Sequence, residues 1–189
     1  PVVSSAASDV YKRQLGYLPL CLAAQSLGEQ LSPVPFSSSI YLAAEAISQF
    51  GTDAQKTTYL SKLASGELVG TLAVVELLDE PEVERLATDY KGESITGTKL
   101  LVPHGQYADI AVVLARGNDG PDMVIVDLAG VERTPVSVVD PTIAAATLRF
   151  DGTGAELLGV SGEGWRQLQS VYDRAAVLMA FEQIGGASK

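Results

Sequence analysis

The spacing of apolar residues changes twice along the chain, and this change constrains the fold more than any other feature. Before Gly66 they recur at helical intervals, whereas from Gly66 to about Glu163 they form short runs separated by Gly, Pro, Asn and Asp. After Glu163 the helical interval returns. The sequence therefore predicts an α+β fold: a helical N-terminal segment, an all-β barrel or sandwich in the middle, and the start of a C-terminal helical bundle.

These changes divide the chain into four predicted parts. Residues 1–14 lack the apolar core of a secretory signal, and their end, DVYKRQ, resembles a translated transposon end, so we expect a cloning or sequencing scar. Residues 15–66 are predicted to form a partial helical domain, 67–160 a β domain, and 161–189 the first helix of a truncated C-terminal domain. The chain is therefore expected to be a fragment of a longer protein.

Within these parts, individual elements can be predicted. Helices are expected at 15–31, closing near Gly28, at 37–50, at 52–64 behind a capping box of Thr52 and Gln55, and from 163 onward. Apolar stripes predict that Trp165 and Tyr172 are core residues of the last helix. Strands are expected at 68–78, 94–102, 110–116, 123–128, 134–139 and 145–150.

Composition excludes several classes of function. A hydrophobic content of 47% supports a buried core, and a net charge of −10 without a basic stripe argues against nucleic-acid binding. Cys21 lies in an apolar helical pattern, so we expect it to be a buried core residue rather than a reactive thiol. A single cysteine fits a reducing compartment, and we expect the cytoplasm. No apolar run has membrane-spanning length, and one His with one Cys makes a metal site unexpected.

Three stretches carry a family resemblance: FGTDAQKTTYLSKLASGELVGTLAVVE (50–76), ITGTKLLVPHGQYADIAVVLAR (95–116) and YDRAAVLMAFEQIGGA (172–187). Each resembles, in the same order, a stretch of the acyl-CoA dehydrogenases, and the similarity extends over 15–189. The resemblance implies FAD as cofactor and an acyl-CoA thioester as substrate. It also implies loss of the α-proton to a carboxylate and of the β-hydrogen as hydride to flavin N5, within a homo- or hetero-oligomer of related subunits.

The resemblance further implies which residues face the flavin. Leu101 stands where the family usually has tryptophan, Pro103 where a threonine or serine bonds flavin N5, and His104 where asparagine is usual. Pro103 has no hydroxyl and no backbone N–H, so it cannot supply that contact. The implied cofactor-binding residues are Val74, Val75, Glu76, Leu101, Val102 and Pro103.

The resemblance also implies a position for the catalytic base. A minority of the family takes it from the residue before the arginine of the last helix, which is Asp173. Asp173 is therefore the candidate base, with an ion pair to a partner helix as its alternative reading. Arg174 either orients the thioester or bonds a neighbouring carboxylate.

Other polar residues are expected to be structural. His104 is read as a loop residue rather than a general base, and Asp109 as fixing the strand turn. The acidic run Asp79–Glu84 is read as a solvated loop. It replaces a Gly- and Ser-rich loop of the family and is a poor neighbour for CoA phosphates.

Three functions remain open at this point. The first is an FAD-dependent acyl-CoA dehydrogenase, of the kind that acts on bulky or steroid-derived acyl chains in bacterial catabolism. The second is a non-catalytic subunit that completes the FAD site of a partner, and the third is a β-barrel binding module without flavin. In each case the 189-residue chain alone is expected to be inactive and to bind FAD weakly or not at all.

Overall fold

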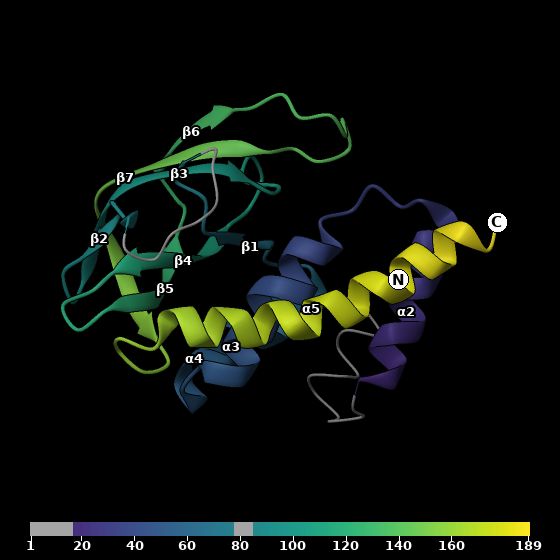
Figure 1. The fold of residues 1–189 in the computed structure, drawn as a ribbon, viewed down its shortest axis with the longest axis horizontal. Coiled ribbons are helices and arrows are strands. Elements are labelled where there is room, and N and C mark those ends of the chain that lie inside the picture. Colours follow the sequence, from purple (N-terminus) through teal and green to yellow (C-terminus); the bar gives the residue numbers. More distant parts are fainter. Residues whose placement is uncertain (1–16, 78–84) are drawn as a thin grey trace.

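The computed structural model describes residues 17–77 and 85–189. The predicted scar at 1–14 and the acidic run Asp79–Glu84 lie outside the described residues. The described chain contains a helical unit, a strand-rich unit with a barrel-like sheet, and a long helix that spans both (Figure 1). The predicted α+β fold class is confirmed. No helix among the described residues is long and apolar enough to cross a bilayer.

The helical unit comprises α2 (Leu18–Gln30), a π-helix η1 (Ser37–Ala44), α3 (Glu45–Phe50) and α4 (Asp53–Ser65). The capping box predicted for α4 is present: the Gln55 N–H donates to Thr52 Oγ1 at 3.2 Å, and the Thr52 N–H donates to Gln55 Oε1 at 3.0 Å. Gly28 does not close α2 as expected, because the helix continues to Gln30 and ends in a left-handed Leu31 (φ 48°). Gly28 is buried within the helix instead.

The sheet forms a closed ring of strands. Its members are β2 (Asp89–Tyr90), β3 (Ser94–Val102), β4 (Ile110–Arg116), β5 (Pro121–Asp127) and β7 (Ala146–Leu158), with β1 (Gly70–Ala73) and β6 (Glu132–Pro135) attached. β1 and β2 pair with β4 in parallel, which the sequence did not predict, and the other pairs are antiparallel. No crossover helix joins the described strands.

β4 lies at the centre of the fold because both of its faces are buried. Ile110, Val112 and Leu114 pack in the cluster shared with the helices, while Ala111 and Val113 pack inside the barrel. A strand buried on both faces is uniformly apolar rather than alternating. This explains the continuous run IAVVLA that ends at Arg116.

The predicted strands differ most from the structure at β1, β6 and β7. The first strand ends at Ala73, the predicted 134–139 strand lies at Glu132–Pro135, and the predicted 145–150 strand continues to Leu158. The sequence DGTG suggested a turn after Phe150, but a left-handed Gly152 (φ 63°) lets β7 continue. β7 pairs with β3 and β6 along its first part and with β5 along its last.

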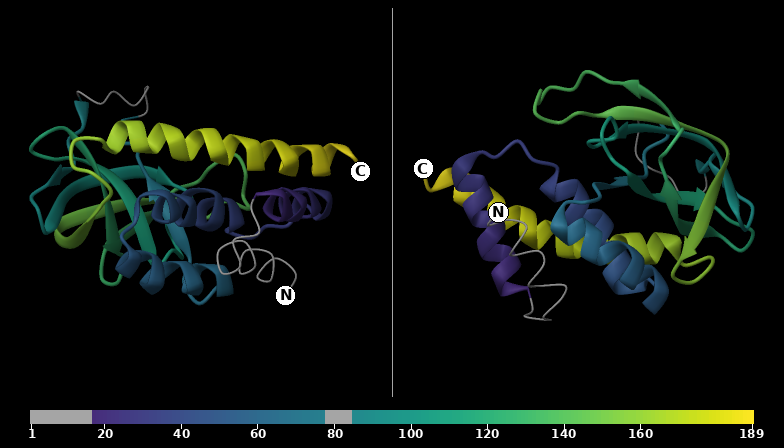
Figure 2. Two further views of the ribbon diagram at one scale, coloured as in Figure 1. Left: turned by 90° about the horizontal axis from the view of Figure 1, so that it is seen from below. Right: turned by 180° about the vertical axis from the view of Figure 1, so that it is seen from behind.

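The long helix α5 (Gly164–Ala187) runs from the sheet alongside η1 and α2 (Figure 2). Trp165 is partly buried against the shared core, but Tyr172 is 44% exposed, so its prediction as a core residue is wrong. Val177, Met179 and Ile184 are exposed as well. The described residues therefore cover only one side of α5, on which Leu168, Val171, Leu178 and Gly185 are buried.

Candidate functional site

Two segments that are far apart in the sequence lie side by side where β1 and β3 end. The Leu100 N–H donates to the Val75 carbonyl at 2.7 Å, and the Thr71 hydroxyl donates to the Pro103 carbonyl at 2.6 Å. The first bond joins the segment after β1 to β3, and the second joins β1 to the turn after β3. The two segments named for the cofactor therefore lie side by side.

The turn after β3 has an uncommon backbone. Leu101 (φ 51°) and His104 (φ 53°) are left-handed, and the β3–β7 register shifts between Lys99 and Val102. A β-bulge of this kind re-aims a side chain. Leu101 is 37% exposed while Val102 is buried, so the bulge presents the leucine at the surface.

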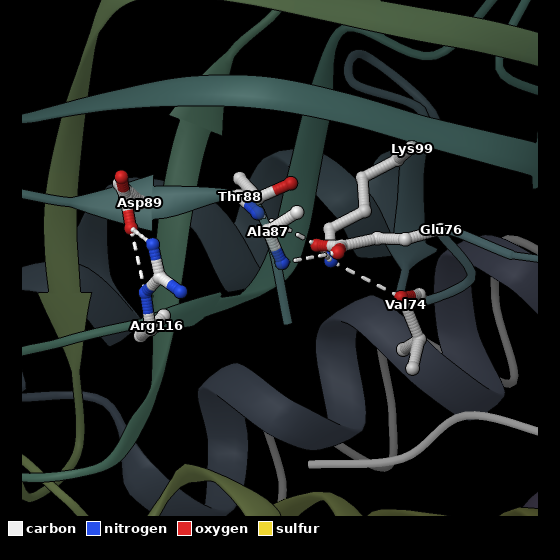
Figure 3. A network of polar contacts seen from close by, with 7 residues as sticks. All are labelled: Val74, Glu76, Ala87, Thr88, Asp89, Lys99 and Arg116. Atoms are coloured by element: carbon white, nitrogen blue, oxygen red, sulfur yellow. Dashed lines mark hydrogen bonds and ion pairs between the residues drawn. The ribbon is translucent and has the colours of Figure 1, made fainter. Parts of the chain in front are cut away.

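A buried ion pair supports the segment after β1 (Figure 3). Lys99 Nζ lies 2.6 Å from Glu76 Oε1 and donates to the Val74 carbonyl at 3.1 Å. The Glu76 carboxylate also accepts from the Thr88 N–H at 3.0 Å and the Ala87 N–H at 2.5 Å. The Lys99 side chain is 0% exposed, and that of Glu76 is 9% exposed.

The two charges respond differently to this burial. Burial by itself raises the pKa of Glu76, but the hydrogen bonds from Lys99 and the Ala87 N–H outweigh it and leave the pKa of Glu76 lowered. Burial lowers the pKa of Lys99, and Glu76 opposes that shift. Glu76 is thus held as a carboxylate with its acceptor positions used, which suits a structural anchor better than a base.

Sequence reasoning missed Lys99, although a signal was present. In β3, residues 95, 97 and 99 share one face because side chains alternate along a strand. Ile95 on that face is buried, so Lys99 had to be buried as well and needed an acidic partner. Only the tertiary pairing of β1 with the sheet identifies that partner as Glu76.

His104 is 7% exposed and contacts the helical unit. Its Nδ1 lies 3.1 Å from the hydroxyl of Ser38 at the start of η1, and the next residue, Ser39, accepts from the Gly70 N–H at 3.0 Å. His104 is therefore a turn residue that connects the β3 turn to η1. Burial lowers the pKa of His104, although the charge of Asp140 opposes the shift.

His104→Asn is expected to flatten the dependence of Tm on pH between about pH 7 and 5. Because the folded pKa of His104 lies below the unfolded value of about 6.5, the unfolded chain binds the proton first. His104 therefore costs wild-type stability as the pH falls below about 6.5. Asparagine tolerates a left-handed backbone and carries no charge, so it keeps the turn without this cost. Thermal melts of both proteins at matched pH values test this, and parallel profiles would rule it out.

Asp109 and Cys21 have the structural roles predicted for them. Asp109 Oδ2 accepts from the Val69 N–H at 2.7 Å, which fixes the start of β4 beside the start of β1. Cys21 is buried in α2, and burial raises the pKa of its thiol. Among the residues described, no cluster of three or more His, Cys, Asp or Glu could hold a metal ion.

Arg174 bonds a neighbouring carboxylate, which is one of its two predicted readings. Its Nη1 donates to Glu45 Oε1 at 3.0 Å and to the Tyr17 hydroxyl at 2.6 Å, and the guanidinium lies 5.3 Å from the centre of the Tyr17 ring. The Glu45 side chain is 2% exposed, so it needs this cation. Burial and the hydrogen bond to Glu45 raise the pKa of Tyr17 to about 12.

Asp173 lies on the exposed part of α5. No hydrogen bond or ion pair joins it to another described residue, so the alternative of a cation on a partner helix is not realised within them. Its neighbours Ala176, Val177 and Ala180 are also exposed. Asp173 therefore stands on an apolar but open surface.

The family model described as acyl-CoA dehydrogenase, N-terminal domain, matches residues 11–67. Acyl-CoA dehydrogenase FadE27 of Mycobacterium tuberculosis is 30% identical over 155 residues, which are 82% of this chain and 39% of that protein. (2S)-Methylsuccinyl-CoA dehydrogenase of Cereibacter sphaeroides is 30% identical over 176 residues, covering 77% of this chain and 31% of that protein. The chain thus spans about a third to two fifths of these relatives.

Solved structures agree in fold. Butyryl-CoA dehydrogenase from Megasphaera elsdenii has a TM-score of 0.84 at 22% identity, over 97% of this chain and 55% of that one. The steroid acyl-CoA dehydrogenase Tcur3481-Tcur3483 has a TM-score of 0.78 at 28% identity, over 93% of this chain and 48% of that one. Because its sequence matches the family model and relatives named as acyl-CoA dehydrogenases, the chain belongs to the acyl-CoA dehydrogenase family.

Proposed function

We propose that this chain is part of an FAD-dependent acyl-CoA dehydrogenase that removes the α-proton of an acyl-CoA thioester while the β-hydrogen leaves as hydride to flavin N5. The observation that carries the proposal is that the segment after β1 lies beside the end of β3, where the Val75 carbonyl accepts from the Leu100 N–H at 2.7 Å. FAD, when bound, supplies the hydride acceptor.

The donor set at these segments fits such a cofactor. The N–H groups of Val75 and Glu76 donate to no acceptor among the described residues, although the Val75 carbonyl is used. These two N–H groups can donate hydrogen bonds to the carbonyl oxygens and ring nitrogens of a flat heteroaromatic ring. The exposed Leu101 side chain can pack against that ring. Pro103 cannot contribute, because it has no N–H and Thr71 occupies its carbonyl.

The chain's own residues then divide the proton chemistry. Asp173 would accept the α-proton. Because the α-proton of a thioester is only weakly acidic, this step requires fixed hydrogen-bond donors on the thioester carbonyl. Arg174, which already holds Glu45, keeps the adjoining helical turn in place.

The second candidate is a non-catalytic subunit of a mixed oligomer. Pro103 and the engagement of Arg174 with Glu45 favour it. The similar structures include the Tcur3481-Tcur3483 steroid enzyme and the ChsE4-ChsE5 complex from Mycobacterium tuberculosis, each of which is named as a pair of proteins. Under either candidate we propose a bulky or steroid-derived acyl-CoA as substrate.

The visible absorption spectrum of the complete protein tests both candidates. Flavin bound by the protein alone supports the first, and flavin bound only after mixing with a related neighbouring subunit supports the second. Absence of flavin in both samples after incubation with excess FAD contradicts the proposal. An unrelated acyl-CoA-binding protein in place of the subunit serves as the control.

A further inference from the structure

The Glu76–Lys99 pair is built differently from a chance surface contact. The Glu76 carboxylate accepts hydrogen bonds only from residues distant in the sequence. The donors are Lys99 in β3 and the N–H groups of Ala87 and Thr88 before β2. Lys99 in turn reaches back to the carbonyl of Val74. One pair therefore fixes the residues after β1 at both ends of the Val74–Glu76 segment.

This arrangement controls the backbone between the two bonds. The Val75 carbonyl points toward β3, where it accepts from the Leu100 N–H at 2.7 Å. With Val74 and Glu76 both held by Lys99, the N–H groups between them have little freedom to turn.

We propose that Glu76 and Lys99 are positioning residues, whose buried ion pair holds the N–H groups of Val75 and Glu76 in the orientation that receives the cofactor. The inference rests on the proposed function for the role of those N–H groups. It adds that the Glu76 side chain is neither a base nor a cofactor ligand. Lys99 contacts no proposed ligand, but it is needed to hold the Val75 and Glu76 N–H groups that receive the cofactor.

An exposed pair nearby provides the matched control. Arg116 contacts Asp89 at 2.5 Å through Nη2 and at 2.8 Å through Nε, and it lies in the same view (Figure 3). The side chains of Arg116 and Asp89 are 56% and 36% exposed. Exposed pairs contribute little, whereas removing one partner of a buried pair leaves an uncompensated charge.

The test compares three variants of the complete protein: Lys99→Met, the double variant Glu76→Gln with Lys99→Met, and Arg116→Met. FAD affinity is measured by titration with FAD, and amide hydrogen exchange is followed at Leu100. The single variant is expected to unfold more easily because Glu76 is left unpaired. The double variant removes both charges, so its Tm should return toward that of the wild type.

The double variant separates positioning from mere stability. Its FAD affinity should stay at least about tenfold weaker, the equivalent of one to two lost hydrogen bonds, and its Leu100 amide should exchange faster. Arg116→Met should match the wild type in both. Wild-type affinity and exchange in a folded double variant would overturn the proposal. If the wild type binds no FAD either alone or with a related subunit, the proposed function fails, and the exchange at Leu100 still decides whether the pair positions the segment.

Discussion

Asp173→Asn in the complete protein is expected to slow flavin reduction by acyl-CoA about 10²–10⁴-fold, the usual cost of losing a positioned base. Flavin content and Tm should not change, because Asp173 is exposed and bonds no described residue. The asparagine keeps the size of the side chain and removes only its ability to accept a proton. Rapid mixing of the flavin-loaded protein with acyl-CoA, followed at the flavin absorption band, measures the rate.

Asp173→Glu is the matched control for this prediction. The added methylene lengthens the reach of the carboxylate and keeps its ability to accept a proton, so the rate should be kept or increased. If the chain is the non-catalytic subunit, Asp173→Asn should change the rate by less than about threefold. That result would remove Asp173 from the mechanism and favour the mixed oligomer.

Gly185→Ala is expected to destabilise the protein by about 1–3 kcal/mol, because α2 and α5 cross too closely for a methyl group. A Cβ at Gly185 would lie 2.0 Å from the Gln25 carbonyl oxygen, and one at Gly28 would lie 1.8 Å from that of Glu182. Both neighbours are backbone atoms, so the helices themselves must separate. Urea unfolding of the variant and the wild type gives the difference.

Gly186→Ala should have the opposite sign. The nearest atom to a Cβ at Gly186 is the Gly28 carbonyl oxygen at 3.7 Å, an ordinary contact. Alanine in a helix is then favoured over glycine by roughly 0.5–1 kcal/mol. Equal effects of the two substitutions would show that the crossing is not as close as described.

The parts of the fold that were predictable are those decided by local chemistry. The change of apolar period at Gly66 separates α4 from the strands, and the Thr52 cap begins α4 where expected. The run at 110–116 is apolar enough to be a strand in any context. Local signals failed at two glycines: Gly28 lies in the close crossing with α5, and Gly152 adopts a left-handed backbone that lets β7 continue.

The candidate site divides in the same way. The two segments that meet at the ends of β1 and β3 were named through their family resemblance, and they do lie together. Lys99 and Thr71, which hold these segments, were not named, and Glu76 was named without the anchoring role of its side chain. These residues acquire their partners only when separate strands pair. The π-helix η1, which buries Ser38 and Ser39 side by side, replaced an expected α-helix without any local signal.

The crossing of α2 with α5 joins the first described helix to the last, and this affects how the chain is made. During synthesis α2 leaves the ribosome long before α5, and at about 5–20 residues per second the interval lasts on the order of ten seconds. Throughout that time Leu20, Ala24 and Leu27, which are buried in the finished fold, have no helix to cover them. α2 therefore leaves these apolar side chains exposed until α5 has been synthesised, and its packing is completed only when that helix arrives.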